Sequence, residues 1–235
     1  MSITLAAYGD STIFGATTNG TAAGPQPGAD GSLVTQVAEP APAALQRLLV
    51  AKFGPVVTVQ NHGISGTTCA DWLNGTGGVP LPWKAEMNLS RADIVLICLG
   101  INDNPTAFQD QYEEMVHVAE SAGKRIVIQT PNTVDASWAS DGEDDKTAIV
   151  RGIGRAAADV GVWTHDAVVA DFAAETDAMG AAWHDELSYS TMFGVWSGIH
   201  PIQGDADKGT GYYRMANCEF RAVAPLVAAM LGVPC

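Results

Sequence analysis

Four short motifs along the chain contain the residue types that nucleophilic catalysis requires. Ser11 lies in the sequence Gly-Asp-Ser-Thr, and His200 lies in the sequence Gly-Ile-His-Pro. A serine hydroxyl becomes an effective nucleophile when an imidazole accepts its proton. Gly63 lets its backbone approach a substrate and Asn102 offers a neutral amide, so both are donors suited to a developing oxyanion. Each motif alone is typical of a turn, but the four together predict acyl transfer.

The elements between these motifs alternate between strands and helices. Five short segments are typical of buried strands, and they lie at Ile3–Tyr8, Val56–Val59, Asp93–Leu99, Arg125–Gln129 and Val162–His165. This alternation predicts an α/β fold of three α/β/α layers around a mostly parallel sheet. Reactive groups in such sheets gather beyond the carboxyl ends of the strands. Ser11, Gly63 and Asn102 each follow a predicted strand, so we expect the fold to bring them together.

Helical spacing of apolar residues and helix-stop signals predict the other elements. We expect helices at Pro42–Phe53, Thr67–Leu73, Pro105–Ala122, Asp144–Val160 and Gly211–Leu231, with a short helix from Val168. Pro225 predicts a kink or a second start in the last helix. Thr17–Asp30 and Asn74–Pro82 are predicted loops, and Ala181–Ser197 is aromatic and irregular.

The composition indicates a globular protein that does not bind nucleic acid. The chain has 235 residues, of which 47% are hydrophobic and 16% charged, and its formal net charge is −14. We expect one domain over residues 1–235. The scattered Lys and Arg argue against nucleic acid or an anionic membrane surface as partner, and no apolar run is long enough to insert in a membrane. The chain opens directly into a strand pattern, so we expect a cytoplasmic protein, or a secreted one if a leader has been removed. The oligomeric state is left open.

Taken in this order, the motifs make the chain resemble the SGNH, or GDSL, hydrolase family of serine esterases and lipases. The resemblance implies a flavodoxin-like fold and a role for each matched residue. Ser11 would be the nucleophile and His200 the general base. The backbone N–H groups of Ser11 and Gly63 and the side-chain amide of Asn102 would form the oxyanion hole. No metal or organic cofactor is implied, and a dinucleotide-like pattern at Gly152–Ala157 lies inside a predicted helix rather than after a strand.

One position departs from the family's pattern. The family usually has an aspartate three residues before the histidine, and Ser197 stands there in this chain. A neutral acceptor near Ser197 would orient His200 without neutralising its charge. An expanded segment after His200 contains Asp205 and Asp207, either of which could serve instead as a displaced acid. We favour the neutral acceptor, because Asp205 follows a glycine in a polar loop.

Residues beside the motifs have predicted supporting roles. Asp10 and Asp103 are expected to accept backbone N–H bonds and fix their loops rather than to take part in the reaction. Ser65 and Thr67 are expected to fix a loop and cap a helix. Cys98 lies in an apolar run and is expected to pack as a small hydrophobic residue.

The aromatic segment before His200 bears on the substrate. Trp183, Phe193 and Trp196 would form a wall that binds the ester or stacks on a sugar, or they would close a local hydrophobic cluster. The chain shows no long apolar lid, which favours esters with short acyl groups, acetyl above all, as substrates. The alcohol part of the ester could be a carbohydrate. The predicted substrate is thus a small-molecule or carbohydrate ester. Two alternatives remain: an acyltransferase with the same site, and a catalytically weakened carbohydrate-binding or structural module.

Overall fold

The protein folds around one parallel sheet, as the sequence predicts. A computed structural model describes residues 2–17, 25–27, 33–134, 167–190 and 197–235. Its central sheet has the strand order β5-β1-β6-β7-β8, and every neighbouring pair is parallel. The strands are β1 (Ile3–Gly9), β5 (Val57–Gly63), β6 (Ile94–Cys98), β7 (Arg125–Gln129) and β8 (Val168–Ala170).

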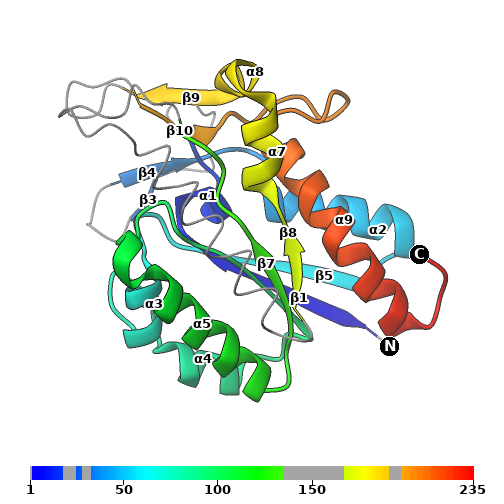
Figure 1. The fold of residues 1–235 in the computed structure, drawn as a ribbon. Helices are drawn as coiled ribbons and strands as arrows, with labels where there is room; N and C mark the ends of the chain where they lie inside the picture. Colours follow the sequence, from blue (N-terminus) through cyan, green and yellow to red (C-terminus); the bar gives the residue numbers. More distant parts are fainter. Residues whose placement is uncertain (1, 18–24, 28–32, 135–166, 191–196) are drawn as a thin grey trace.

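Helices cover both faces of this sheet, which gives the three predicted layers (Figure 1). One face packs against α2 (Ala41–Phe53) and α9 (Tyr212–Leu231). The other packs against α3 (Cys69–Asn74), α4 (Trp83–Leu89) and α5 (Pro105–Ser121). Each of the five residues of β6 is buried, as a central strand covered on both faces requires. Cys98 contributes to one of the two cores, as predicted.

The order of the strands creates a switch point at the carboxyl end of the sheet. From β1 the chain first pairs β5 on one side and then β6 on the other. Such a reversal leaves a binding region beyond the carboxyl ends of the strands on either side of it. Ser11 follows β1 and Asn102 follows β6, so both belong to this region of the fold.

The last strand of the sheet is not the predicted one. Val162–His165 lies outside the described residues, as does the predicted helix Asp144–Val160. The strand beside β7 is β8, which occupies the residues where a short helix was predicted. Val168 and Val169 are β-branched and suit a strand. The helix α7 (Phe172–Met179) begins only after Asp171, whose side chain accepts a hydrogen bond from the Ala174 N–H.

Short strands and one helix also replace predicted loops. The predicted loop Thr17–Asp30 contains β3 (Pro25–Pro27), which with β2 (Ala16–Thr17) pairs with β4 (Leu33–Gln36). The segment predicted as irregular contains α8 (Ala181–His184) and β9 (Leu187–Ser190), which pairs with β10 (Ser197–Pro201). The sequence prediction did not include α4, which holds the buried Trp83.

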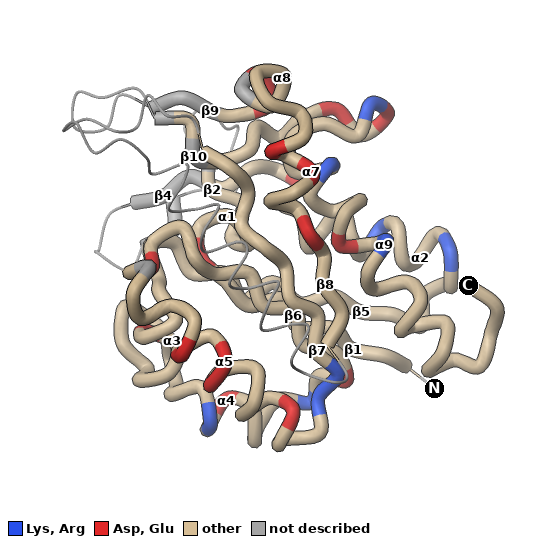
Figure 2. Tube along the Cα trace, viewed as in Figure 1, with Lys and Arg blue, Asp and Glu red and all other residues tan. Residues whose placement is uncertain are grey.

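The last helix runs unbroken through its proline. Pro225 stands inside α9 with its side chain exposed, so the missing N–H lies on the solvent side. None of the helices that the structure describes is long and apolar enough to cross a membrane. Figure 2 shows Lys and Arg at several separated points of the described trace, with Asp and Glu between them.

Candidate active site

The Ser11 hydroxyl meets an imidazole at the carboxyl end of the sheet. Ser11 opens the short helix α1 (Ser11–Phe14), directly after β1, and its side chain is 4% exposed. Its Oγ lies 2.8 Å from Nε2 of His200, which stands in β10. This is the distance at which a base can take the hydroxyl proton. The structure therefore joins the first and the last of the four motifs.

Burial keeps the imidazole of His200 uncharged at neutral pH. Desolvation lowers its pKa from 6.5 to about 4. A buried imidazolium lacks the hydration that stabilises its charge, so the neutral form is favoured. Neutral His200 can accept a proton from Ser11, which is the protonation state that a general base needs.

Asp10 holds the helix that presents Ser11. Its Oδ1 accepts hydrogen bonds from the backbone N–H and the hydroxyl of Thr12, both at 2.8 Å. Asp10 is thus the N-cap of α1, as the loop-fixing prediction requires. Its side chain is fully buried, and desolvation raises its pKa to about 6.

Asp103 and Thr67 also fix loops through hydrogen bonds, as predicted. Asp103 Oδ1 accepts a hydrogen bond from the Cys69 N–H at 2.8 Å, and burial raises the pKa of this carboxyl. Thr67 donates from its hydroxyl to the Ile64 carbonyl at 2.8 Å, which fixes the loop after β5. The cap of α3 is Thr68 rather than Thr67, because Thr68 forms a capping box with Asp71.

Of the predicted oxyanion donors, Gly63 is the last residue of β5 and Asn102 lies on the loop after β6. Asn102 is exposed, and its amide donates to the Thr67 carbonyl at 3.2 Å. The Gly63 N–H donates to Asn61 Oδ1 at 2.9 Å, so in this structure that donor has a partner within the chain. A Cβ on Gly63 would lie 2.2 Å from the Phe14 nitrogen. The missing side chain therefore allows β5 to approach the helix that carries Ser11.

The turn around Gly66, a residue without a predicted role, lies next to these donors. Gly66 has a φ of +81°, a conformation that favours glycine. The turn around it is held against the end of β1, since the Ile64 N–H donates to the Gly9 carbonyl at 3.0 Å. It adjoins Thr67, whose carbonyl accepts the Asn102 amide. The available signal was the Ser-Gly pair directly before two threonines, which is typical of a tight turn.

The acidic residues of the expanded segment form their own turn. Asp205 Oδ1 accepts from the Asp207 N–H at 2.9 Å and from the Lys208 N–H at 3.3 Å. Its Oδ2 lies 3.3 Å from Lys208 Nζ. Asp205 and Asp207 are both exposed. These contacts hold the Asp205 carboxylate within its own turn. Ser197 begins β10 opposite Ser190, and its side chain is outside the described residues.

The prediction of a substrate-binding role for Trp183 is wrong. Its side chain is 1% exposed, and its indole N–H donates to the Thr133 carbonyl at 2.8 Å. Its ring packs edge-on against Phe172 in the core. A residue enclosed in this way cannot form a wall that a substrate touches, because its polar and apolar surfaces are both covered. Phe193 and Trp196 lie outside the described residues.

Three solved structures share the fold over nearly the whole chain. A lipase/acylhydrolase from Enterococcus faecalis superposes with a TM-score of 0.64 at 18% identity, over 94% of this chain and 95% of that chain. The acetylxylan esterase Axe2 from Geobacillus stearothermophilus gives 0.64 at 20% identity, over 94% of each chain. LAE5, an alpha/beta hydrolase enzyme from the metagenome of Lake Arreo in Spain, gives 0.62 at 20% identity, over 95% and 97%. At such identities the likeness shows the fold.

Sequence comparison identifies the family. No curated protein matches the chain significantly. The family model described as GDSL-like Lipase/Acylhydrolase matches residues 7–203, which include Ser11, Asn102 and His200. The match spans most of the chain and makes the protein a carboxylic ester hydrolase by class. The chain therefore belongs to the GDSL-like lipase/acylhydrolase family.

Proposed function

We propose that the protein hydrolyses short-chain carboxylic esters through an acyl-enzyme on Ser11. The observation that carries this proposal is the 2.8 Å contact between Ser11 Oγ and His200 Nε2 at the end of the parallel sheet. In the first step His200 takes the hydroxyl proton while Oγ attacks the ester carbonyl carbon. The tetrahedral intermediate collapses, and the proton passes from His200 to the leaving alcohol. Water then attacks the acyl-enzyme by the same route and releases the acid.

The oxyanion that forms in each step needs donors already in place. We assign this role to the Ser11 N–H and the Asn102 amide, with a further backbone donor from the end of β5 or the loop after it. Gly63 is the predicted backbone donor, although its N–H is bonded to Asn61 in this structure. Gly66 is the alternative, because its turn is tied to the end of β1 beside Ser11 and adjoins Thr67, to which Asn102 bonds. Preorganised donors of this kind contribute roughly 3–4 kcal/mol each to transition-state stabilisation.

Acetyl esters of small alcohols or of carbohydrates are the proposed substrates. Support comes from the fold that this chain shares with an acetylxylan esterase from Geobacillus stearothermophilus. A panel of 4-nitrophenyl esters of increasing chain length, followed by acetylated xylo-oligosaccharides, tests the proposal. Turnover that is highest for acetate and absent in Ser11→Ala would support it. A preference for long acyl chains would contradict the short-chain assignment and leave the ester-hydrolase class intact.

A further inference from the structure

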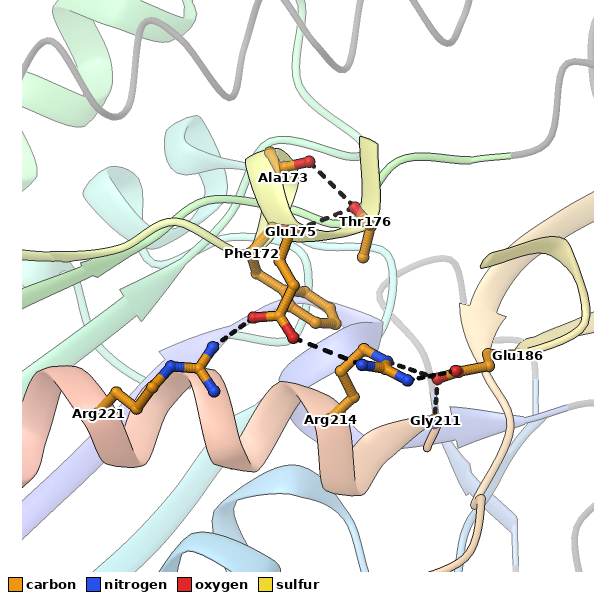
Figure 3. Close-up of polar contacts among 8 residues, drawn as sticks. All are labelled: Phe172, Ala173, Glu175, Thr176, Glu186, Gly211, Arg214 and Arg221. Carbon is orange, nitrogen blue, oxygen red and sulfur yellow. Dashed lines mark hydrogen bonds and ion pairs between the residues drawn. The ribbon is translucent and has the colours of Figure 1, made fainter. Parts of the chain in front are cut away.

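A cluster of four charged side chains joins α7, the start of β9 and α9 (Figure 3). Arg214 on α9 makes a two-pronged contact with Glu186, with Nη2 2.7 Å from Oε1 and Nε 2.9 Å from Oε2. Glu186 is only 7% exposed. Glu175 on α7 lies 3.6 Å from Arg214 and also pairs with Arg221. Bidentate pairs of this kind fix geometry as well as charge.

Glu186 also fixes the base of the hairpin that carries His200. It directly precedes β9, and its backbone carbonyl accepts the N–H of Ile202, which directly follows β10, at 2.8 Å. Its side-chain Oε2 accepts the Gly211 N–H at 2.7 Å. The Tyr212 N–H in turn donates to the Ile202 carbonyl at 3.0 Å. The hairpin base is thus bonded to the first turn of α9 through side chain and backbone.

The crossing at Gly211 is too close for any other residue. Its φ is +58°, and a Cβ there would lie 2.2 Å from the Ile202 carbonyl oxygen. The backbone of α9 therefore passes directly against the hairpin base. His200 stands two residues before Ile202 and pairs with Ser188 across the hairpin. A shift of the hairpin base relative to α9 would displace the imidazole with it.

The same turn of α9 holds the nucleophile. The Tyr212 hydroxyl donates to the Ala16 carbonyl at 2.7 Å, and this contact is buried. Ala16 directly follows Gly15, the C-cap of the helix that Ser11 opens. The first turn of α9 is therefore bonded both to the segment of Ser11 and to the hairpin of His200, which are far apart in sequence.

We propose that the Glu186–Arg214 pair positions His200 against Ser11. This inference rests on the proposed function, in which His200 is the base. An aspartate three residues before the histidine is absent, so orientation must come from elsewhere, and the pair supplies it through the backbone of the hairpin. Two strands of four and five residues are marginally stable without outside support. Misplacement of a catalytic group by about 1 Å costs roughly 10²-fold in rate.

Arg214→Met and Glu186→Gln test the pair, with Arg221→Met as a matched control. Arg221 lies on the same helix and pairs with Glu175 of α7 rather than with Glu186 at the hairpin base. We expect Arg214→Met and Glu186→Gln to lower kcat roughly 10²-fold with little change in KM, and to slow labelling of Ser11 by a phosphonate in parallel. Arg214→Lys should recover part of the loss. Arg221→Met should keep the wild-type kcat.

The outcomes separate this inference from the proposed function. If the wild type turns over esters and Ser11→Ala does not, the function stands. A folded Arg214→Met with the kcat of Arg221→Met would then overturn the positioning role alone. If Arg214→Met or Glu186→Gln does not fold, Arg214→Lys and Glu186→Asp replace them, with folding checked by circular dichroism. Wild-type kcat in Glu186→Asp, whose shorter side chain breaks the two-pronged contact with Arg214, would equally overturn the proposal, and a lowered kcat at unchanged melting temperature would support it.

Discussion

Ser11 Oγ and His200 Nε2 lie 2.8 Å apart although 189 residues separate them in the chain. Ser11 is placed by β1 and by the Asp10 cap, whereas His200 is placed by a two-stranded hairpin outside the central sheet. The reactive pair thus depends on how that hairpin docks against the rest of the domain.

Ser11→Ala should abolish ester turnover without unfolding the protein. The substitution removes one hydroxyl and its bond with His200, while the capping bonds that Thr12 donates to Asp10 remain. Ala at the first helical position has no steric cost, so the melting temperature should change by only a few degrees. The measurement is turnover of 4-nitrophenyl acetate together with labelling by a serine-directed phosphonate. Wild-type turnover in the folded variant would exclude Ser11 as the nucleophile.

The acid limb of the pH profile should lie well below the usual range for histidine. His200 acts as a base only when neutral, and desolvation lowers its pKa to about 4. The value of kcat/KM should therefore hold as the pH falls through 6.5 and decline only near pH 4. A profile of kcat/KM from pH 3.5 to 9 measures this. A midpoint near 6.5 would mean that His200 is solvated in the free enzyme, and one near 6 would point to ionisation of Asp10.

Asn102→Ala should lower kcat roughly 10²–10³-fold, with a smaller change in KM. The reason is that its amide would act mainly on the oxyanion of the transition state. Its bond to the Thr67 carbonyl is long, at 3.2 Å, and the residue is exposed, so the stability cost should be small. Asn102→Asp is the sharper variant, because its charge would repel the oxyanion, and we expect at least an equal loss. A raised KM with an unchanged kcat would show that Asn102 binds the ground state instead.

Local patterns in the sequence predicted most of the layered fold. The continuous apolar run Ile94–Leu99 predicted β6, because a strand covered on both faces has no polar side. The predicted ends of two helices, at Phe53 and Ala122, lie within a residue of the ends of α2 and α5. The meeting of Ser11 and His200 followed from the family resemblance and from the rule that parallel strands share one reactive end.

Other features depended on tertiary contacts that no local pattern encodes. Val168–Ala170 is too short for its period to separate a strand from a helix, and its pairing with β7 decides the matter. Trp183 is aromatic in an irregular segment, which suits a binding wall and a core equally well. The bond of its indole N–H to Thr133 decides for the core. Gly63 was selected for a backbone that could approach a substrate, yet its close neighbour in the structure is Phe14.

Glu219→Gln should remove a pH dependence of stability. Glu219 on α9 is fully buried, and within the described part of the chain neither carboxyl oxygen has a hydrogen-bond partner. Desolvation raises its pKa from 4.5 to about 8. The folded state therefore binds the proton of Glu219 more tightly than the unfolded state does. The stability that this proton contributes is lost as the pH rises from about 4.5 to about 8. In that window the free energy of unfolding should fall by about 1.4 kcal/mol per pH unit from this group.

Urea unfolding between pH 5 and 9 measures how the free energy of unfolding depends on pH in the wild type and in Glu219→Gln. Asp10 has a raised pKa and contributes in the same direction at lower pH, so only the difference between the two proteins reports on Glu219. The variant should be more stable than the wild type at pH 9. Glu113→Gln, at an exposed position of α5, is the matched control and should follow the wild type. Equal slopes for wild type and Glu219→Gln would mean that Glu219 is ionised in the folded state.

Ser197→Asp should raise kcat if a neutral group now orients His200. A carbonyl or hydroxyl acceptor keeps Nδ1 protonated and so preserves the tautomer in which Nε2 accepts the Ser11 proton. It cannot neutralise the imidazolium that forms during attack. The burial that lowers the His200 pKa makes that charge costly, so an added carboxylate three residues before it should help. The same variant should raise the His200 pKa and move the acid limb of kcat/KM upward.

Asp205→Ala and Asp207→Ala should retain nearly all activity in the same experiment. Asp205 directs its oxygens to the N–H groups of Asp207 and Lys208 and to the Lys208 ammonium, inside an exposed turn. Removing that carboxylate should loosen the turn without reaching His200. Initial rates with 4-nitrophenyl acetate, beside melting temperatures for all three variants, distinguish the two accounts. A folded Asp205→Ala or Asp207→Ala that is nearly inactive, with no gain from Ser197→Asp, would establish a displaced acid. A gain from Ser197→Asp with both alanine variants active would establish that His200 works in the wild type without a carboxylate partner.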